Sequence, residues 1–161
     1  MHIPKTSHIT QIQRNAPSYP ARLLDLYDPP NSLYIYGDID LLTLPMIAIV
    51  GSRAASPEGL KNAHYFAQAL SAEGYLVVSG LAKGIDGAAH LGALGPEQNR
   101  PTIAVCGTGL DLVYPKEHLE LAHAIGNSGL LISELAQESG QKPGTSPAET
   151  ALLQPYPWES W

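Results

Sequence analysis

The sequence predicts an α/β fold built on a doubly wound, mainly parallel sheet in three layers. Four short apolar runs begin about 28 residues apart, close to the ~30 residues of one strand–helix–strand unit. The runs are continuous rather than alternating, as expected for parallel strands covered on both faces. Stretches with helical spacing separate them, so the pattern is that of a Rossmann-like sheet. The four runs occupy residues 47–50, 75–78, 102–105 and 130–132.

The helices between these runs have recognisable ends. Ser56 is a good N-cap, Pro57 suits the first helical turn, and Gly74 ends the helix. A second helix is expected over 85–94, and a third after Pro115. The residues expected to face inward are Leu60, Ala63, Ala67 and Leu70 in the first helix and Leu119, Ala122 and Ile125 in the third, which stops at Gly126 or Gly129.

The flanks of this repeating region differ from it. Residues 1–32 are polar and contain prolines, so we interpret them as a lead-in segment to a core domain over 33–136. Within the core, 33–37 is expected to form an extra strand at an edge of the sheet. Residues 137–161 form a Pro-rich tail without helical or strand periodicity, expected to be loop. Its aromatic residues that are able to dock on the core are Tyr156, Trp158 and Trp161.

Composition limits the function classes. The 161 residues suit one domain. No apolar run is long enough to span a membrane and no secretory signal is evident, so we expect a cytoplasmic protein. The single cysteine, Cys106, lies in an apolar run and is expected to be a small buried residue. The net charge of −6 opposes nucleic-acid binding overall and suits a small-ligand binder better.

Ligands of such sheets bind beyond the carboxyl ends of the strands. The first strand is followed by Gly51, Ser52 and Arg53. Glycine lets a ligand approach the backbone, Ser52 offers a hydroxyl group, and the guanidinium of Arg53 suits phosphate. The alternative is that Gly51 serves only the turn and that Arg53 is a solvated surface residue.

The loop after the second strand is rich in glycine and opens a helix. Free N–H groups there favour an anion, and Lys83 adds a positive charge. Asp86 is either part of this site or a residue that caps the helix. His90 is expected to be buried and hydrogen-bonded. The loop reads Ser79-Gly80-Leu81-Ala82-Lys83-Gly84-Ile85-Asp86.

The third and fourth strands also end in small or polar residues. Gly107-Thr108-Gly109 follows the third strand and supplies another flexible edge to the same crevice. Tyr114 either stacks on a base or packs before the proline that follows it. Glu134 follows the fourth strand, where it either accepts a hydrogen bond from a ligand or binds loop N–H groups.

Several other site types are not supported by the sequence. The dinucleotide-binding G-x-G-x-x-G and the phosphate-binding G-x-x-x-x-G-K-[ST] motifs are absent. The histidines have no metal-ligand spacing, and His118 and His123 lie five residues apart on one expected helix. No G-x-S-x-G elbow occurs. We therefore expect no cofactor, no metal and no catalytic residue.

The series of loops resembles the DNA-processing protein A family (DprA, also called Smf). The similarity covers about residues 10–147 and depends on the order of the motifs, since each alone is weak. The resemblance implies a phosphate- and single-stranded-DNA-binding protein that is not an enzyme. The matching motifs are Gly51-Ser52-Arg53, then 79–86 with Ala89-His90, then Gly107-Thr108-Gly109-Leu110-Asp111 with Tyr114-Pro115, then Ile132-Ser133-Glu134.

By this resemblance, the chain acts in DNA processing during natural transformation, protects single-stranded DNA and helps to load RecA recombinase. The family's Rossmann-like core forms dimers, so a homodimer is implied. Phosphates would contact Gly51, Ser52, Arg53 and the 79–86 loop, with Lys83 as the main charge there. The family's F-P-x-R-N-R segment is absent from this sequence. A phosphate-binding arginine of that segment is therefore expected to be missing.

Two alternatives remain open. The wider superfamily contains nucleotide sensors and nucleoside-monophosphate phosphoribohydrolases, in which the crevice would hold a free nucleotide and Glu134 or Asp86 would act as the base. The P-G-G-x-G-T segment of those enzymes is reduced here to Pro143-Gly144-Thr145, in another position. The second alternative is an interaction protein that keeps the fold and has lost ligand binding.

Overall fold

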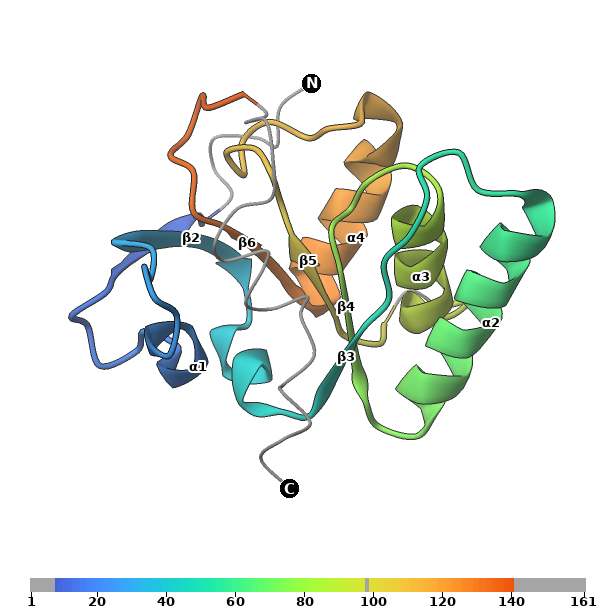
Figure 1. Ribbon diagram of the computed structural model, residues 1–161, viewed down its shortest axis with the longest axis horizontal. Coiled ribbons are helices and arrows are strands. Elements are labelled where there is room, and N and C mark those ends of the chain that lie inside the picture. The colour runs from blue at the N-terminus through green and yellow to red at the C-terminus, as the bar shows by residue number, and fades with distance from the viewer. Residues whose placement is uncertain (1–7, 98, 141–161) are drawn as a thin grey trace.

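A six-stranded sheet forms the centre of the molecule (Figure 1). The structure is a computed structural model and describes residues 8–97 and 99–140. The strand order is β1-β2-β6-β5-β4-β3. The four strands from β3 to β6 run parallel, whereas β2 pairs antiparallel with both β6 and β1. The strands are β1 (Thr10–Gln13), β2 (Ser32–Gly37), β3 (Met46–Ala48), β4 (Leu76–Ser79), β5 (Thr102–Val105) and β6 (Leu130–Ser133).

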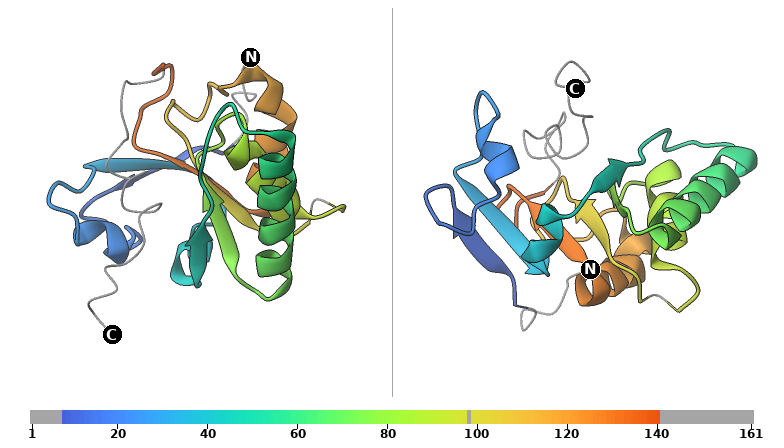
Figure 2. Two further views of the ribbon diagram at one scale, coloured as in Figure 1. Left: turned by 45° about the vertical axis from the view of Figure 1, so that its right-hand side comes forward. Right: turned by 90° about the horizontal axis from the view of Figure 1, so that it is seen from below.

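Three helices connect the parallel strands and lie over one face of the sheet (Figure 2). They are α2 (Pro57–Ala72), α3 (Ile85–Leu94) and α4 (Leu119–Ser128). Each new parallel strand is added on the same side of the previous one. Right-handed crossovers therefore place all three helices on the same face. The helices α2 and α3 approach closely at Gly92. A Cβ at this position would overlap the carbonyl oxygen of His64, so the contact requires glycine.

The N-terminal part of the chain covers the other face. The short helix α1 (Ala21–Leu24) and the 3₁₀ turn η1 (Ile39–Thr43) contribute Leu23 and Leu42 to the core on this side. Alternate strand residues face the two layers, since Val78 packs with Leu23 and the neighbouring Val77 packs with α2 and α3. The structure thus confirms the α/β sheet in three layers.

Most of the expected elements are confirmed. The four apolar runs are β3 to β6, and α3 spans 85–94. The hydroxyl of Ser56 accepts a hydrogen bond from the N–H of Gly59 at 3.1 Å, as an N-cap should. Pro115 precedes a 3₁₀ turn, η2 (Lys116–His118), and α4 stops before Gly129. Cys106 is buried.

The expected edge position of the 33–37 strand is wrong. β2 lies between β1 and β6, and the edge strand is β1, which belongs to the lead-in segment. Only Ile12 of β1 is buried. The other three residues of this strand are polar, so the sequence carries no apolar run that would predict it. Residues 137–140 have no regular structure, and the aromatic residues of the tail lie outside the described residues. None of the helices in the described part of the chain has the length and hydropathy needed to span a bilayer.

Candidate functional site

The loops after β3 and β4 are joined at the carboxyl edge of the sheet, at the top of Figure 1. The N–H of Ile85 donates to the carbonyl oxygen of Ser52 at 3.2 Å. Gly84 has φ +79°, and a Cβ there would overlap the Ser52 carbonyl and lie 2.9 Å from the Arg53 oxygen. Only glycine permits this approach, so the two loops form one surface, and Arg53 and Lys83 belong to it.

The loop after β3 is open to solvent. Gly51, Ser52 and Arg53 are all exposed. The hydroxyl of Ser52 accepts a hydrogen bond from the N–H of Ala54 at 3.1 Å, which holds the turn. The side chain of Arg53 has no hydrogen bond or ion pair with any residue that the structure describes. Its guanidinium donors are therefore available to a ligand.

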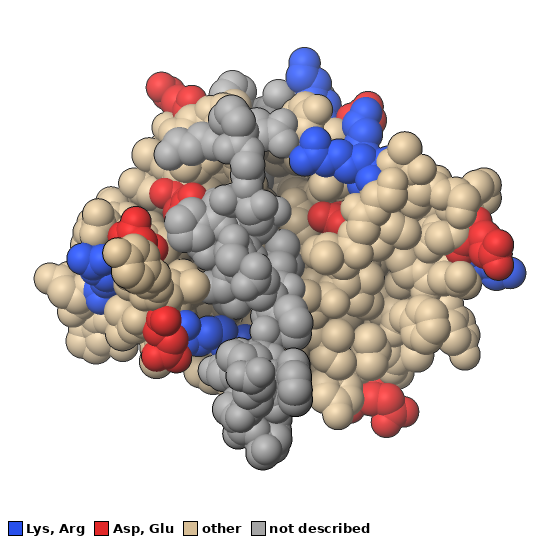
Figure 3. All heavy atoms as spheres, in the orientation of Figure 1, with Lys and Arg blue, Asp and Glu red and all other residues tan. Residues whose placement is uncertain are grey.

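Lys83 is exposed but already has a partner. Its Nζ lies 3.2 Å from Oε1 of Glu117 in η2, and the two side chains are 55% and 68% exposed. In Figure 3, Lys and Arg side chains gather at the upper edge of the molecule with acidic atoms among them. The edge thus carries mixed charge, and Glu117 is an acidic residue there that the sequence analysis did not single out.

Asp86 is buried and organises the loop after β4. Its carboxylate accepts a hydrogen bond from the N–H of Gly80 at 3.1 Å. Burial raises the pKa of this carboxyl, and the N–H groups of Gly80, Gly51 and Ala82 oppose the rise. These N–H groups point at an internal carboxylate. The free donors expected at the start of α3 are therefore partly used by the protein itself.

Three other predicted site residues are held by internal contacts. The hydroxyl of Ser79 is fully buried and donates to the carbonyl of Ile49 at 2.6 Å. That of Thr108 donates to the carbonyl of Leu112 at 2.7 Å. A Cβ at Gly109 would overlap a backbone oxygen of the segment after β6. These residues shape the edge, whereas Gly107 has open space where a Cβ would be.

Tyr114 lies beside the loop after β4. Its side chain is 54% exposed. Together with Gly80, Leu81 and Gly107 it lines a cavity of about 20 Å³, room for about one water molecule. Tyr114 therefore lies beside the loop that carries Lys83.

Glu134 lies elsewhere. It lines a groove of about 590 Å³ with Asp28, Asn31 and Tyr34, and no residue of the loops after β3 or β4 lines that groove. Glu134 follows β6, which β5 and β4 separate from β3, the strand that precedes Arg53. The nucleotide-hydrolase alternative needs Glu134 or Asp86 as a base in the crevice. Glu134 lines another groove, and Asp86 is buried and accepts a hydrogen bond from the protein backbone.

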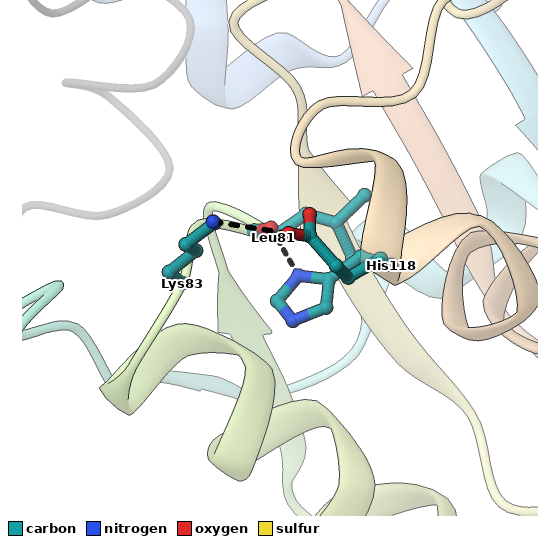
Figure 4. A network of polar contacts seen from close by, with 4 residues as sticks. Leu81, Lys83 and His118 are labelled. Atoms are coloured by element: carbon teal, nitrogen blue, oxygen red, sulfur yellow. Dashed lines mark hydrogen bonds and ion pairs between the residues drawn. The ribbon is translucent and has the colours of Figure 1, made fainter. Parts of the chain in front are cut away.

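His118 contacts the loop after β4, a contact that the sequence did not indicate. Its Nδ1 lies 2.8 Å from the carbonyl oxygen of Leu81, and its ring lies where a Cβ of Gly87 would be (Figure 4). Leu81 has φ +61°, unusual for a leucine, and its side chain is buried. Because 37 residues separate His118 from Leu81, no local pattern could reveal the contact.

His90 is fully buried, as expected. The hydroxyl of Thr102 donates to the carbonyl of Val77 at 2.7 Å, so its oxygen accepts the 3.0 Å hydrogen bond from Nδ1 of His90. The other ring nitrogen, Nε2, has no partner among the described residues. Burial lowers the pKa of His90 to about 3, and the ring is neutral at physiological pH.

The arrangement of the edge favours anion binding. It combines one guanidinium that has no partner in the described part of the chain, one paired ammonium group, exposed glycine backbone and a half-exposed aromatic ring. In residues 8–97 and 99–140, no group of three or more His, Cys, Asp or Glu side chains is placed to hold a metal ion.

The chain also matches known proteins. Residues 10–151 match the model of the DNA recombination-mediator protein A family. The chain belongs to this family. It is 49% identical over 116 residues to DNA processing protein DprA of Streptococcus pneumoniae strain R6, covering 72% of this chain and 40% of that protein. It is 38% identical over 141 residues to Protein Smf of Synechocystis, covering 85% of this chain and 35% of that protein.

Two solved structures of DNA processing protein A share this fold. The X-ray structure of the Streptococcus pneumoniae protein superposes with a TM-score of 0.76 and 40% identity, over 91% of this chain and 50% of that one. A structure of the Helicobacter pylori protein, which concerns its single-stranded DNA binding mode, superposes with a TM-score of 0.72 and 31% identity, over 89% of this chain and 62% of that one. The chain spans less than half the length of the curated relatives it matches.

Proposed function

We propose that this chain binds the phosphate backbone of single-stranded DNA without catalysing a reaction. The observation that carries the proposal is that two joined loops hold Lys83 and Arg53, whose side chain has no partner among the described residues. A planar guanidinium matches phosphate geometry, and an ammonium group on the joined loop suits another phosphate of the same strand. The relationship to a protein whose structure concerns single-stranded DNA binding supports the same ligand.

The predicted site residues divide into three roles. Gly51, Ser52, Arg53, Lys83, Gly84 and Gly107 would face the phosphates. Tyr114 would stack on a base, which is a sequence-tolerant contact. Ser79, Gly80, Asp86, Thr108 and Gly109 would position these loops. Glu134 would lie outside the phosphate path, in the groove beside β2.

The charge of the chain limits the affinity. With a net charge of −6, the field of the whole protein opposes a polyanion, and the local pair Arg53 and Lys83 must overcome it. Contacts of this kind weaken steeply with salt because binding releases counterions. We therefore expect binding at low ionic strength and much weaker binding at physiological salt.

The wider role follows from the family. We propose that the chain takes part in DNA processing in natural transformation in the cytoplasm, with RecA recombinase as a protein partner and a homodimer as the assembly. The description of the family as a recombination mediator supports the role in DNA processing and the partnership with RecA. We also propose the division into a 1–32 lead-in, a 33–136 core and a 137–161 tail.

Fluorescence anisotropy with three ligands tests the proposal. Labelled oligo-dT is expected to bind at low salt, duplex DNA of equal length more weakly, and AMP not to compete at millimolar concentration. Binding of AMP in preference to oligo-dT, or release of free base from it, would favour the nucleotide alternative. Failure of all three ligands would leave an interaction protein without a nucleic-acid site.

A further inference from the structure

The η2 turn contacts the loop after β4 at two points, drawn in Figure 4. His118 binds the backbone through the Leu81 carbonyl at 2.8 Å. Glu117, the residue before it, binds the side chain of Lys83 at 3.2 Å. One three-residue turn thus holds both the backbone and the charge of the proposed phosphate site.

The backbone contact makes the loop rigid. Leu81 has a positive φ and a buried side chain, and its carbonyl is held by the His118 ring. Three residues later, Gly84 is packed against the backbone of the loop after β3. Lys83 lies between these two anchors, so its side chain can change partner while its backbone remains in place.

The side-chain contact is weak enough to exchange. Both partners are more than half exposed, and ion pairs in water contribute little. The pKa of Glu117 lies below its ordinary value, because its own backbone N–H and then Lys83 favour the charged form. At neutral pH the carboxylate is therefore ionised and occupies the position that a phosphate oxygen would take beside Lys83.

We propose that Glu117 is a competitor for the phosphate site that is built into the protein. It holds Lys83 when no DNA is bound and releases it when a phosphate arrives. A single phosphate that can reach only Lys83 gains little by replacing one anion with another. A chain of phosphates that contacts Arg53 and Lys83 together gains the unpaired arginine as well. Glu117 thus selects polyanions over single phosphate groups. This inference rests on the proposed function.

The test compares Glu117→Gln with Glu120→Gln in the full chain. Glu120 is exposed in the first turn of α4 and has no ion pair with a described residue. Both substitutions remove one negative charge, but only the first frees Lys83. Glu117→Gln is expected to tighten binding of labelled oligo-dT about two- to fivefold at low salt, with a smaller change for Glu120→Gln. It is also expected to make inorganic phosphate a better competitor of the oligonucleotide.

A double-mutant cycle shows whether Glu117 acts through Lys83. In a Lys83→Gln background, Glu117→Gln is expected to change affinity no more than Glu120→Gln does. Equal effects of the two glutamate variants in the native background would overturn the proposal, as would a full Glu117→Gln effect without Lys83. Binding that depends on Arg53 but ignores Glu117 would refute this inference alone. No binding by any variant would refute the proposed function as well.

Discussion

The carboxylate of Asp86 accepts a hydrogen bond from the N–H of Gly80 at 3.1 Å, which fastens the start of α3 to the end of β4. A carboxylate of the protein itself therefore accepts the hydrogen bond inside the turn between β4 and α3. The proposed ligand is left with the outer side of the turn, where Lys83 and the loop after β3 are exposed.

Removing this acid should destabilise the fold. In Asp86→Ala the N–H of Gly80 loses its acceptor in a mostly buried position. The free energy of unfolding should fall by about 1–3 kcal/mol. Urea denaturation followed by circular dichroism measures the change. Asp28→Ala, which removes an exposed carboxylate, should change the stability by less than about 0.5 kcal/mol. Equal effects would contradict the role assigned to Asp86.

Two glycines with positive φ provide a matched pair for the joined loops. Gly84 (φ +79°) packs against Ser52 and Arg53, whereas Gly74 (φ +91°) has nothing within 4 Å of a Cβ position. Gly74→Ala should cost only the backbone strain, about 1–2 kcal/mol. Gly84→Ala should cost more and should separate the loops.

Thermal unfolding and oligo-dT binding together measure this difference. Binding should be lost in Gly84→Ala under conditions in which that variant is still folded, and kept in Gly74→Ala. If Gly84→Ala folds and binds DNA like the native chain, the close contact of the two loops is not needed for the site.

Burial of His90 should make the protein acid-sensitive. The pKa of about 3 in the folded state lies below the ordinary value of 6.5, so the unfolded chain binds a proton that the folded one does not. Stability is therefore lost as pH falls through 6.5 toward 3. The loss attributable to His90 should be about 2 kcal/mol between pH 7 and pH 5.

Urea midpoints at the two pH values test this effect in two variants. His90→Gln should lower the stability at pH 7 and reduce its fall toward pH 5. His64→Gln, which removes an exposed histidine, should keep the native pH dependence. A fall in stability that is the same in all three proteins would show that His90 does not cause it.

Stacking at Tyr114 can be separated from its packing. If the exposed ring stacks on a base, Tyr114→Phe should bind oligo-dT like the native chain. Tyr114→Ala should lose about 1–3 kcal/mol of binding free energy. Anisotropy titrations measure both. Native affinity in Tyr114→Ala would leave the residue with a packing role only.

The sheet was predictable because its signals are local. The apolar runs that became β3 to β6, and the Ser56–Pro57 start of α2, are contained in a few consecutive residues. β1 was missed because only one of its four residues is buried. Its pairing with β2 is decided by tertiary contacts that no local pattern carries.

The site was predictable only in part, because its contacts join distant residues. Arg53 and Lys83 were grouped because glycine loops after parallel strands meet at one edge, and the structure joins these two loops. Their contact with a ligand stays a prediction. Glu117 lies 34 residues from Lys83, so its effect on the charge there was not visible. Glu134 was grouped with these loops because it follows a strand, but it lines another groove, together with Tyr34 of β2.

The most direct test of the account is the salt dependence of oligo-dT binding in Arg53→Ala. Arg14→Ala is the matched control, because it removes an equal charge from an exposed residue that follows β1, at the opposite edge of the sheet from β3. Arg53→Ala should weaken binding at least about tenfold at low salt and lower the slope of log K against log salt by about 0.7. Arg14→Ala should leave the slope unchanged. Equal binding by the native chain and both variants would contradict a phosphate site at the joined loops.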